Sequence, residues 1–199
     1  MKNISIILGS TRQGALGRYL FNYLQQLVAT QPKSAVQFTF LDLATYQLPF
    51  FSEALPPMAN PQRTLPANQQ RWVDDMAAAD GYVFLTPEYN HAEPAVLKNA
   101  LDFLGFEMQR KPGKIISYAD NMRGGQFGAA ALVPILQRLG VLVLPKPTPV
   151  GNVQETLQAD GQPIPAAPLA PRYHKGLTAA LAEISYYTTL LTDHPFPNH

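Results

Sequence analysis

The sequence contains no cysteine, few charged residues and no long apolar run. Without cysteine the chain can form no disulfide, no thiolate nucleophile and no cysteine-ligated zinc or iron–sulfur site. Any redox centre must therefore be an imported organic cofactor. Charged residues make up only 15% of the chain, which hints at extra surface buried against another subunit. The net charge of +1 favours neither nucleic acid nor an acidic membrane as a partner, because both require clustered Lys and Arg.

Targeting and membrane-spanning segments are not apparent either. Met1, Lys2 and Asn3 lead directly into an apolar stretch that is too short for the core of a signal peptide. No run approaches the roughly 18 apolar residues of a membrane span. We therefore expect a cytoplasmic protein. Its length of 199 residues, 46% of them hydrophobic, suits one domain with a substantial core.

Short β-branched runs alternate with segments of helical spacing. The run at 4–8 has no polar alternation before Gly9, which is typical of a strand buried on both faces of a parallel sheet. Because strands and helices alternate, we predict an α/β fold with a doubly wound parallel sheet. Further strands are predicted at 36–41, 81–86, 114–118 and 141–144. Helices are predicted at 14–29, 67–79, 94–104, 126–139 and 172–191.

Two proline-rich stretches interrupt this alternation, at 48–66 and 145–171. Both are also rich in small and polar residues, which break regular structure. We interpret them as excursions over the surface of one domain spanning 1–199, because neither would separate a complete sheet from the rest of the chain.

The first loop of functional interest follows the first predicted strand, at 9–14. Ligands of open parallel sheets bind outside the carboxyl ends of the strands. Here Ser10, Thr11 and Arg12 lie at the start of a predicted helix, where free N–H groups and the helix dipole attract a phosphate. Alternatively, Ser10 or Thr11 merely caps the helix and Arg12 is solvated. The glycine patterns of dinucleotide folds and of P-loops are absent.

The second loop, at 86–94, follows the third predicted strand. Tyr89, flanked by Pro87 and Asn90 on a stiff turn, can offer a ring face and backbone groups to a flat heterocycle. The alternative is an ordinary capped turn with Tyr89 half-buried. His91 and Glu93 match half of a zinc deaminase signature, but the cysteine half is missing, so we expect no metal site.

The third loop, at 117–125, follows the fourth predicted strand and ends in Gly124 and Gly125. Paired glycines let the backbone approach a ligand closely. A flexible surface loop is the alternative, and the position after a strand of the sheet favours a ligand site.

These loops, with several other motifs, resemble the NADPH-dependent FMN reductase family of the flavodoxin-like fold, which includes quinone, azo and chromate reductases. The likeness covers roughly residues 4–144. Its motifs are Gly-Ser-Thr-Arg at 9–12, Leu-Pro-Phe-Phe at 48–51, Ala-Asp-Gly at 79–81, Thr-Pro-Glu-Tyr-Asn-His at 86–91, Leu-Lys-Asn-Ala-Leu-Asp at 97–102, Lys-Pro at 111–112 and Gly-Gly at 124–125.

The resemblance implies a flavodoxin-like three-layer sandwich, with a five-stranded parallel sheet of order 2-1-3-4-5 and helices on both faces. It also implies one domain that binds flavin mononucleotide (FMN). The implied phosphate site comprises Ser10, Arg12, Leu16 and Gly17. The isoalloxazine ring is implied to lie against Pro87, Glu88, Tyr89 and Asn90, with Ser117, Asp120, Gly124 and Gly125 at its far edge.

The implied activity is hydride transfer from NADPH or NADH through bound FMN to a quinone-like or other small acceptor, or reduction of FMN itself. The cofactor carries the chemistry, so we expect no catalytic side chain. The helix at 97–102 is implied to build a face of a homodimer or homotetramer. Phe127 and Val133 stand where family members often carry arginine, which leaves the nicotinamide preference and the acceptor open.

Two alternatives remain at this point. A non-enzymatic flavodoxin-type electron carrier would use the same fold and FMN, but such carriers usually present an acidic docking surface, and the net charge of +1 does not supply one. A flavin-free α/β protein would use the first loop for another phosphate ligand.

Overall fold

The computed structural model describes residues 1–31 and 35–197. Strands and helices alternate along the chain as predicted. The strands are β1 (Lys2–Leu8), β2 (Val36–Asp42), β3 (Gly81–Pro87), β4 (Pro112–Tyr118), β5 (Leu142–Val143) and β6 (Thr148–Val150). The helices are α1 (Gly17–Ala29), α2 (Ala67–Ala77), α3 (Ala95–Asp102), α4 (Gln126–Arg138), α5 (Val153–Thr156) and α6 (Ala170–Asp193), with short 3-10 turns η1 (Leu43–Thr45) and η2 (Pro57–Ala59).

The sheet has the strand order β2-β1-β3-β4-β5, and every pairing is parallel. This confirms the predicted order 2-1-3-4-5 and the flavodoxin-like class. Ile6 of β1 pairs with Phe40 on one side and with Val83 on the other. The central strands have neighbours on both sides and helices on both faces, which explains why their sequences lack polar alternation.

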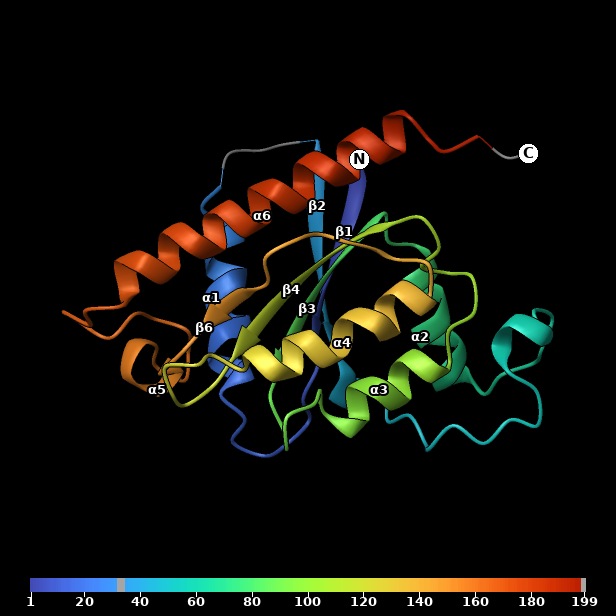
Figure 1. The fold of residues 1–199 in the computed structure, drawn as a ribbon, viewed down its shortest axis with the longest axis horizontal. Helices are drawn as coiled ribbons and strands as arrows, with labels where there is room; N and C mark the ends of the chain where they lie inside the picture. Colours follow the sequence, from blue (N-terminus) through green and yellow to red (C-terminus); the bar gives the residue numbers. More distant parts are fainter. Residues whose placement is uncertain (32–34, 198–199) are drawn as a thin grey trace.

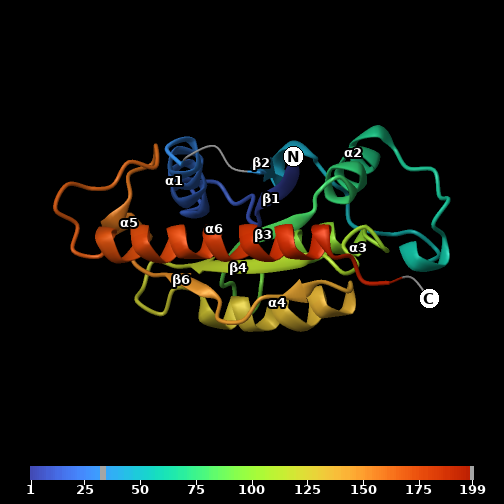
Figure 2. The ribbon, with the colours of Figure 1, turned by 90° about the horizontal axis from the view of Figure 1, so that it is seen from above.

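Helices α1 and α6 cover one face of the sheet, and α2, α3 and α4 cover the other (Figure 1, Figure 2). On the first face, Ile4 and Ile6 pack in one cluster with Leu24 of α1 and Leu181 of α6. On the second face, residues of all three helices pack against β1, β3 and β4, and Trp72 of α2 donates from Nε1 to the Ala100 carbonyl at 2.7 Å. The result is the predicted three-layer sandwich. No helix in residues 1–31 and 35–197 is long and apolar enough to cross a membrane.

Helix α1 begins three residues later than predicted, at Gly17 rather than at Gly14. Gly14 has a φ of 69°, a left-handed conformation that an α-helix excludes. The first loop therefore extends to residue 16, which lengthens the backbone available at the end of β1.

Part of the segment predicted as a surface excursion, 145–171, belongs to the sheet. Residues 148–150 form β6, which pairs with Ile116 to Tyr118 of β4 beyond the point where β5 ends. Val150 and Val153 are fully buried. The prediction was wrong here because Pro147 and Pro149 make the segment resemble a loop in the sequence. Proline is nevertheless tolerated in a strand at the edge of a sheet.

The motif residues 48–51 are attached to α3 through Asn99. The Asn99 side chain accepts a hydrogen bond from the Phe51 N–H at 2.8 Å and donates to the Pro49 carbonyl at 2.8 Å. These two hydrogen bonds join the motif at 48–51 to the motif at 97–102.

Lys114 of β4 is a buried cation that ties β4 to the last helix. It is 3% exposed, and its ammonium donates to the Pro145 carbonyl at 3.0 Å, the Lys146 carbonyl at 2.9 Å and Glu183 of α6 at 2.5 Å. A buried charge is tolerated when all its donors are satisfied. The three bonds fix the connection from β5 to β6 against α6.

We predict that Lys114→Met lowers the free energy of unfolding by about 2 to 4 kcal/mol, because it leaves two carbonyls and a carboxylate without their donor. The matched control is Lys2→Met, which removes a partly exposed ion pair with Asp193 and should cost about 0.5 kcal/mol or less. Urea unfolding of both variants measures the difference. Equal losses would show that Lys114 contributes no more than a surface pair.

Candidate functional site

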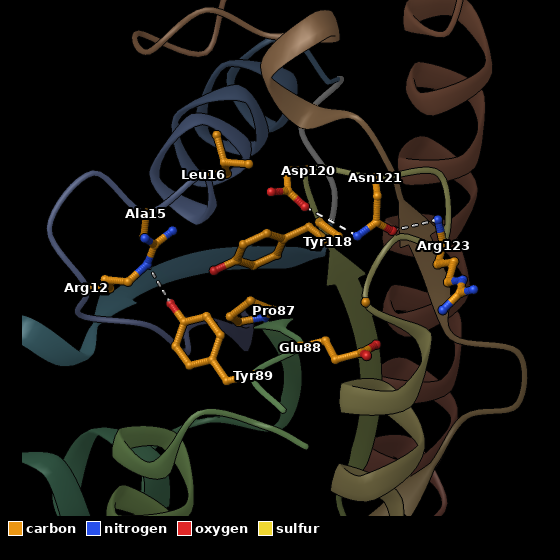
Figure 3. Close-up of a pocket in the computed structure, with 12 residues that line it drawn as sticks. Arg12, Ala15, Leu16, Pro87, Glu88, Tyr89, Tyr118, Asp120, Asn121 and Arg123 are labelled. Atoms are coloured by element: carbon orange, nitrogen blue, oxygen red, sulfur yellow. Dashed lines mark hydrogen bonds between the residues drawn. The ribbon is translucent and has the colours of Figure 1, made fainter. Parts of the chain in front are cut away.

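The carboxyl ends of β1, β3 and β4 bring the three loops around one cavity (Figure 3). Parallel pairing places these ends at the same edge of the sheet, as expected for a doubly wound fold. The residues lining the cavity are Arg12, Ala15, Leu16, Pro87, Glu88, Tyr89, Tyr118, Ala119, Asp120, Asn121, Arg123 and Gly125.

The first loop runs close to β3 and leads into the N-terminus of α1, which no side chain caps. The Gly9 N–H donates to the Leu85 carbonyl at 2.9 Å, and a Cβ at Gly9 would lie 2.6 Å from that oxygen, so only glycine fits. Helix α1 has neither a capping side chain nor an acidic residue in its first turn. Its N–H groups and positive dipole end are therefore available to an anion.

Arg12 and Ser10 join the first loop to the second through Tyr89. Arg12 Nε donates to the Tyr89 hydroxyl at 3.2 Å, and Ser10 Oγ lies 2.8 Å from the same hydroxyl. Figure 3 shows the Arg12 side chain at one side of the cavity, beside Ala15. A cation thus lies next to the open end of α1, where it can bind phosphate oxygens.

The second loop is a tight turn. The backbones of Tyr89 and Ala92 exchange two hydrogen bonds, at 2.8 and 3.1 Å, and the residues between them, Asn90 and His91, have φ values of 53° and 64°. Two successive positive φ angles define a type I′ turn, which is rare for residues other than glycine and asparagine. The turn holds Tyr89 at the cavity and places Asn90 at the exposed tip.

A second helix, α4, also begins beside the cavity, and Glu88 occupies its N-terminus. Its Oε2 accepts a hydrogen bond from the Phe127 N–H at 3.0 Å in the first turn of α4. The carboxylate therefore neutralises the dipole of α4. Of these two helix ends, α1 is the one that remains open to a phosphate.

The third loop is shaped by glycine and held by β6. Gly124 and Gly125 have φ values of 61° and 72°, and a Cβ at Gly125 would lie 2.7 Å from the Tyr118 carbonyl. The Ala119 N–H donates to the Val150 carbonyl at 3.1 Å, and further bonds from residues 152 and 154 reach the carbonyls of residues 121 and 120. The 145–171 segment thus positions the loop.

Tyr118, the last residue of β4, has a buried ring and a hydroxyl that points into the cavity (Figure 3). This hydroxyl has no hydrogen-bond partner among the residues that the structure describes. A Cβ at Gly17 would overlap it, so glycine at this position gives the hydroxyl its room. Burial raises the pKa of Tyr118.

Seven of the twelve predicted site residues line the cavity: Arg12, Leu16, Pro87, Glu88, Tyr89, Asp120 and Gly125. The other five lie close by without lining it. Ser10 is buried behind Tyr89, Gly17 faces Tyr118, Asn90 is at the turn tip, Ser117 is fully buried and Gly124 packs on Pro149.

Sequence reasoning did not single out Ala15 or Tyr118. Ala15 has no polar group that would have signalled it. Tyr118 falls at the end of a predicted strand and within the third loop but has no predicted role of its own, although a tyrosine at the carboxyl end of a buried strand places a polar tip at the ligand edge. Within the described ranges, no three His, Asp or Glu side chains come together as a metal site would require.

A doubly wound sheet of this order, with an open helix N-terminus and a cation beside a cavity at the strand ends, defines a flavodoxin-like nucleotide-binding protein. The comparisons with known proteins narrow this class. The family model for NADPH-dependent FMN reductase matches residues 2–155. The chain belongs to this family, which confirms the resemblance found in the sequence.

Relatives agree with this assignment, and a solved structure agrees with the fold. The chain is 32% identical over 139 residues to the NAD(P)H-dependent FMN reductase ntnL of Nectria sp, covering 69% of this chain and 68% of that protein. It is 28% identical over 149 residues to a 2-hydroxy-1,4-benzoquinone reductase of Burkholderia sp, covering 72% and 75%. The fold matches FerB, a flavoenzyme NAD(P)H:(acceptor) oxidoreductase of Paracoccus denitrificans, with a TM-score of 0.72 at 23% identity over 94% and 99% of the chains.

We predict that Gly125→Ala destabilises the protein more than Gly14→Ala. Both glycines have positive φ, so each alanine costs about 1 kcal/mol of backbone strain. A Cβ at Gly14 meets nothing within 4 Å, whereas one at Gly125 collides with the Tyr118 backbone and should add about 1 to 3 kcal/mol. Thermal unfolding of the two variants tests this, and equal losses would contradict the close approach of the third loop to β4.

Proposed function

We propose that the protein is an FMN-dependent oxidoreductase that takes electrons from NADPH or NADH and passes them to a quinone-like or other small acceptor, or to FMN itself. The observation that carries this proposal is the cavity at the strand ends, with Arg12 and the uncapped N-terminus of α1 on one side. Membership of the FMN reductase family indicates that the cofactor is a flavin. The FMN-binding domain would comprise the whole of 1–199, because α6 packs on the same sheet as α1.

The phosphate of FMN would lie at the start of α1. The N–H groups of its first turn, around Leu16 and Gly17, carry no competing side chain, and Arg12 adds a positive charge. Ser10 would act partly through Tyr89, whose hydroxyl it contacts. Because Glu88 occupies the end of α4, the opposite orientation of the cofactor would bring phosphate and carboxylate together.

The flat ring would lie between the second and third loops. Pro87, Glu88 and Tyr89 form one wall of this space, with Asn90 at the tip of the same turn. Asp120 and Gly125 line the other side, and Ser117 and Gly124 would support it from behind. When bound, FMN supplies the acceptance and release of a hydride. The chain itself needs only to orient the ring and to present N–H groups to the ring edge that gains negative charge. No side chain has to act as an acid or a base.

The names of this chain's relatives favour an enzyme over an electron carrier. Several curated relatives are reductases of FMN or quinones by name, and the net charge of +1 provides no acidic excess for docking a protein. A benzoquinone acts as the acceptor for the Burkholderia relative, as its name states. We propose a small flat acceptor of this kind. The cytoplasmic location stays a prediction.

We further propose that the protein is a homodimer or homotetramer. An apolar groove lies between α3, α4 and the 48–59 segment, where Phe51, Met58 and Ile135 contribute much of the apolar lining. Lys98, Asp102 and Arg138 line the same groove. An apolar centre with charges of both signs around it is suited to a second copy of the same chain.

Reduction of the bound flavin tests the proposed activity directly. The protein is mixed with FMN, and under anaerobic conditions NADPH or NADH should bleach the flavin absorbance, which a benzoquinone should then restore without any partner protein. Protein that is colourless once the unbound FMN has been removed would refute the flavin assignment. Bound flavin that neither nicotinamide reduces would favour the electron carrier.

We predict that Arg12→Met weakens FMN binding about 10- to 100-fold, because one charge-assisted interaction with phosphate is lost. The matched control is Arg71→Met on α2, whose guanidinium binds the Thr45 carbonyl and stacks on Tyr46 away from the cavity. Its dissociation constant should stay within about twofold of the wild-type value. Flavin fluorescence titration measures both, and an unchanged affinity for Arg12→Met would place the phosphate elsewhere.

We predict that Ile135→Arg dissociates the oligomer, because it places an unpaired charge in the apolar groove. Light scattering coupled to size-exclusion chromatography gives the mass. Tyr186→Arg, at an exposed position on α6, is the control and should leave the mass unchanged. A wild-type mass equal to the 21.9 kDa chain would refute the oligomer.

A further inference from the structure

The Tyr118 hydroxyl is a buried polar group whose function the fold alone does not explain. Tyr118 is 2% exposed, and its hydroxyl lacks a hydrogen-bond partner within residues 1–31 and 35–197. The fully buried Tyr82 is different, because its hydroxyl donates to the Met76 carbonyl at 2.7 Å. Leaving a buried hydroxyl unpaired is unfavourable, so phenylalanine would suit the fold better at 118 unless a ligand uses the hydroxyl.

The hydroxyl lies where the phosphate-binding elements meet. It faces Gly17 at the first turn of α1, and it points toward Arg12 and Tyr89 (Figure 3). The Ser10 hydroxyl is close, but its hydrogen bond is made to Tyr89. The N-terminus of α1, the Arg12 guanidinium and the Tyr118 hydroxyl thus converge from three elements on one small region.

The protonation state of Tyr118 suits a donor. Burial and the nearby Tyr89 raise its pKa, and the opposing effects of Ser10, Arg12 and Arg18 are smaller. The hydroxyl therefore keeps its proton at neutral pH. A phosphate monoester offers strong acceptor oxygens and no competing donor near this pH.

We propose that the Tyr118 hydroxyl donates a hydrogen bond to the terminal phosphate of FMN and thereby makes the cavity select FMN over riboflavin. The inference rests on the proposed flavin site. It also assigns a second purpose to Gly17, whose lack of a side chain leaves room for the hydroxyl. A ligand without phosphate would leave the hydroxyl without a partner, so the selectivity has a physical cause.

Tyr118→Phe tests the proposal through binding and stability together. Titration of the protein with FMN and with riboflavin, followed by flavin fluorescence, should show FMN binding weakened about 10-fold and riboflavin binding changed by less than about twofold. Thermal unfolding without flavin should give a melting temperature equal to or above that of the wild type, because the variant removes a hydroxyl that has no hydrogen-bond partner among the described residues.

Tyr82→Phe is the matched control, since it deletes the hydroxyl of another buried tyrosine in the same sheet. It leaves the Met76 carbonyl without its donor and should lower the melting temperature while leaving the affinity for FMN unchanged. The opposite behaviour of the two variants separates a ligand contact from a structural one.

The titrations distinguish failure of this inference from failure of the proposed function. If the wild type binds neither flavin, the proposed function fails. If the wild type binds FMN and Tyr118→Phe binds it equally well, the inference is overturned while the proposed function stands. Equal weakening of FMN and riboflavin would also overturn it, because the hydroxyl would then contact the part that both flavins share.

Discussion

Parallel pairing of β1, β3 and β4 is the constraint on which the site depends. The registers that join Leu8 to Leu85, and Thr86 to Ser117, bring three chain segments to the same edge of the sheet. Each segment must then leave the sheet at once, since a helix follows it on one face or the other. Short loops rich in glycine and turn residues are the result, and their backbone groups point into the cavity that they enclose.

The two helix N-termini at this edge are not equivalent, and the difference sets the polarity of the site. Helix α1 begins without a capping side chain, whereas Glu88 satisfies an N–H group of α4. A negatively charged group is therefore favoured at α1 and disfavoured at α4. Arg12 and Tyr118 lie on the α1 side of the cavity (Figure 3). The helix dipole, the Arg12 cation and the Tyr118 hydroxyl therefore all favour a negatively charged group on this side.

Rigidity of the third loop comes from elements distant in the sequence. Strand β6 binds Ala119, Lys114 fixes the connection that leads to β6, and Tyr173 of α6 accepts a hydrogen bond from the Gly151 N–H at 3.0 Å. The last third of the chain thus holds a loop that contributes to the cavity. A family likeness limited to the earlier part of the chain does not reveal this support.

The sequence by itself determined the fold class, the order of elements and the three loops, because these depend on local patterns: buried β-branched runs, helical spacing and glycine at turns. It also predicted that Arg12, Pro87, Tyr89 and Gly125 belong to the site, and these four residues line the cavity. Tertiary structure alone decided that β6 joins the sheet and that Glu88 caps α4. It also decided that the Tyr118 hydroxyl points toward Arg12 and has no hydrogen-bond partner in the part of the chain that the structure describes. Each of these three features depends on contacts between groups that are distant in the sequence, and a local sequence pattern does not predict such contacts.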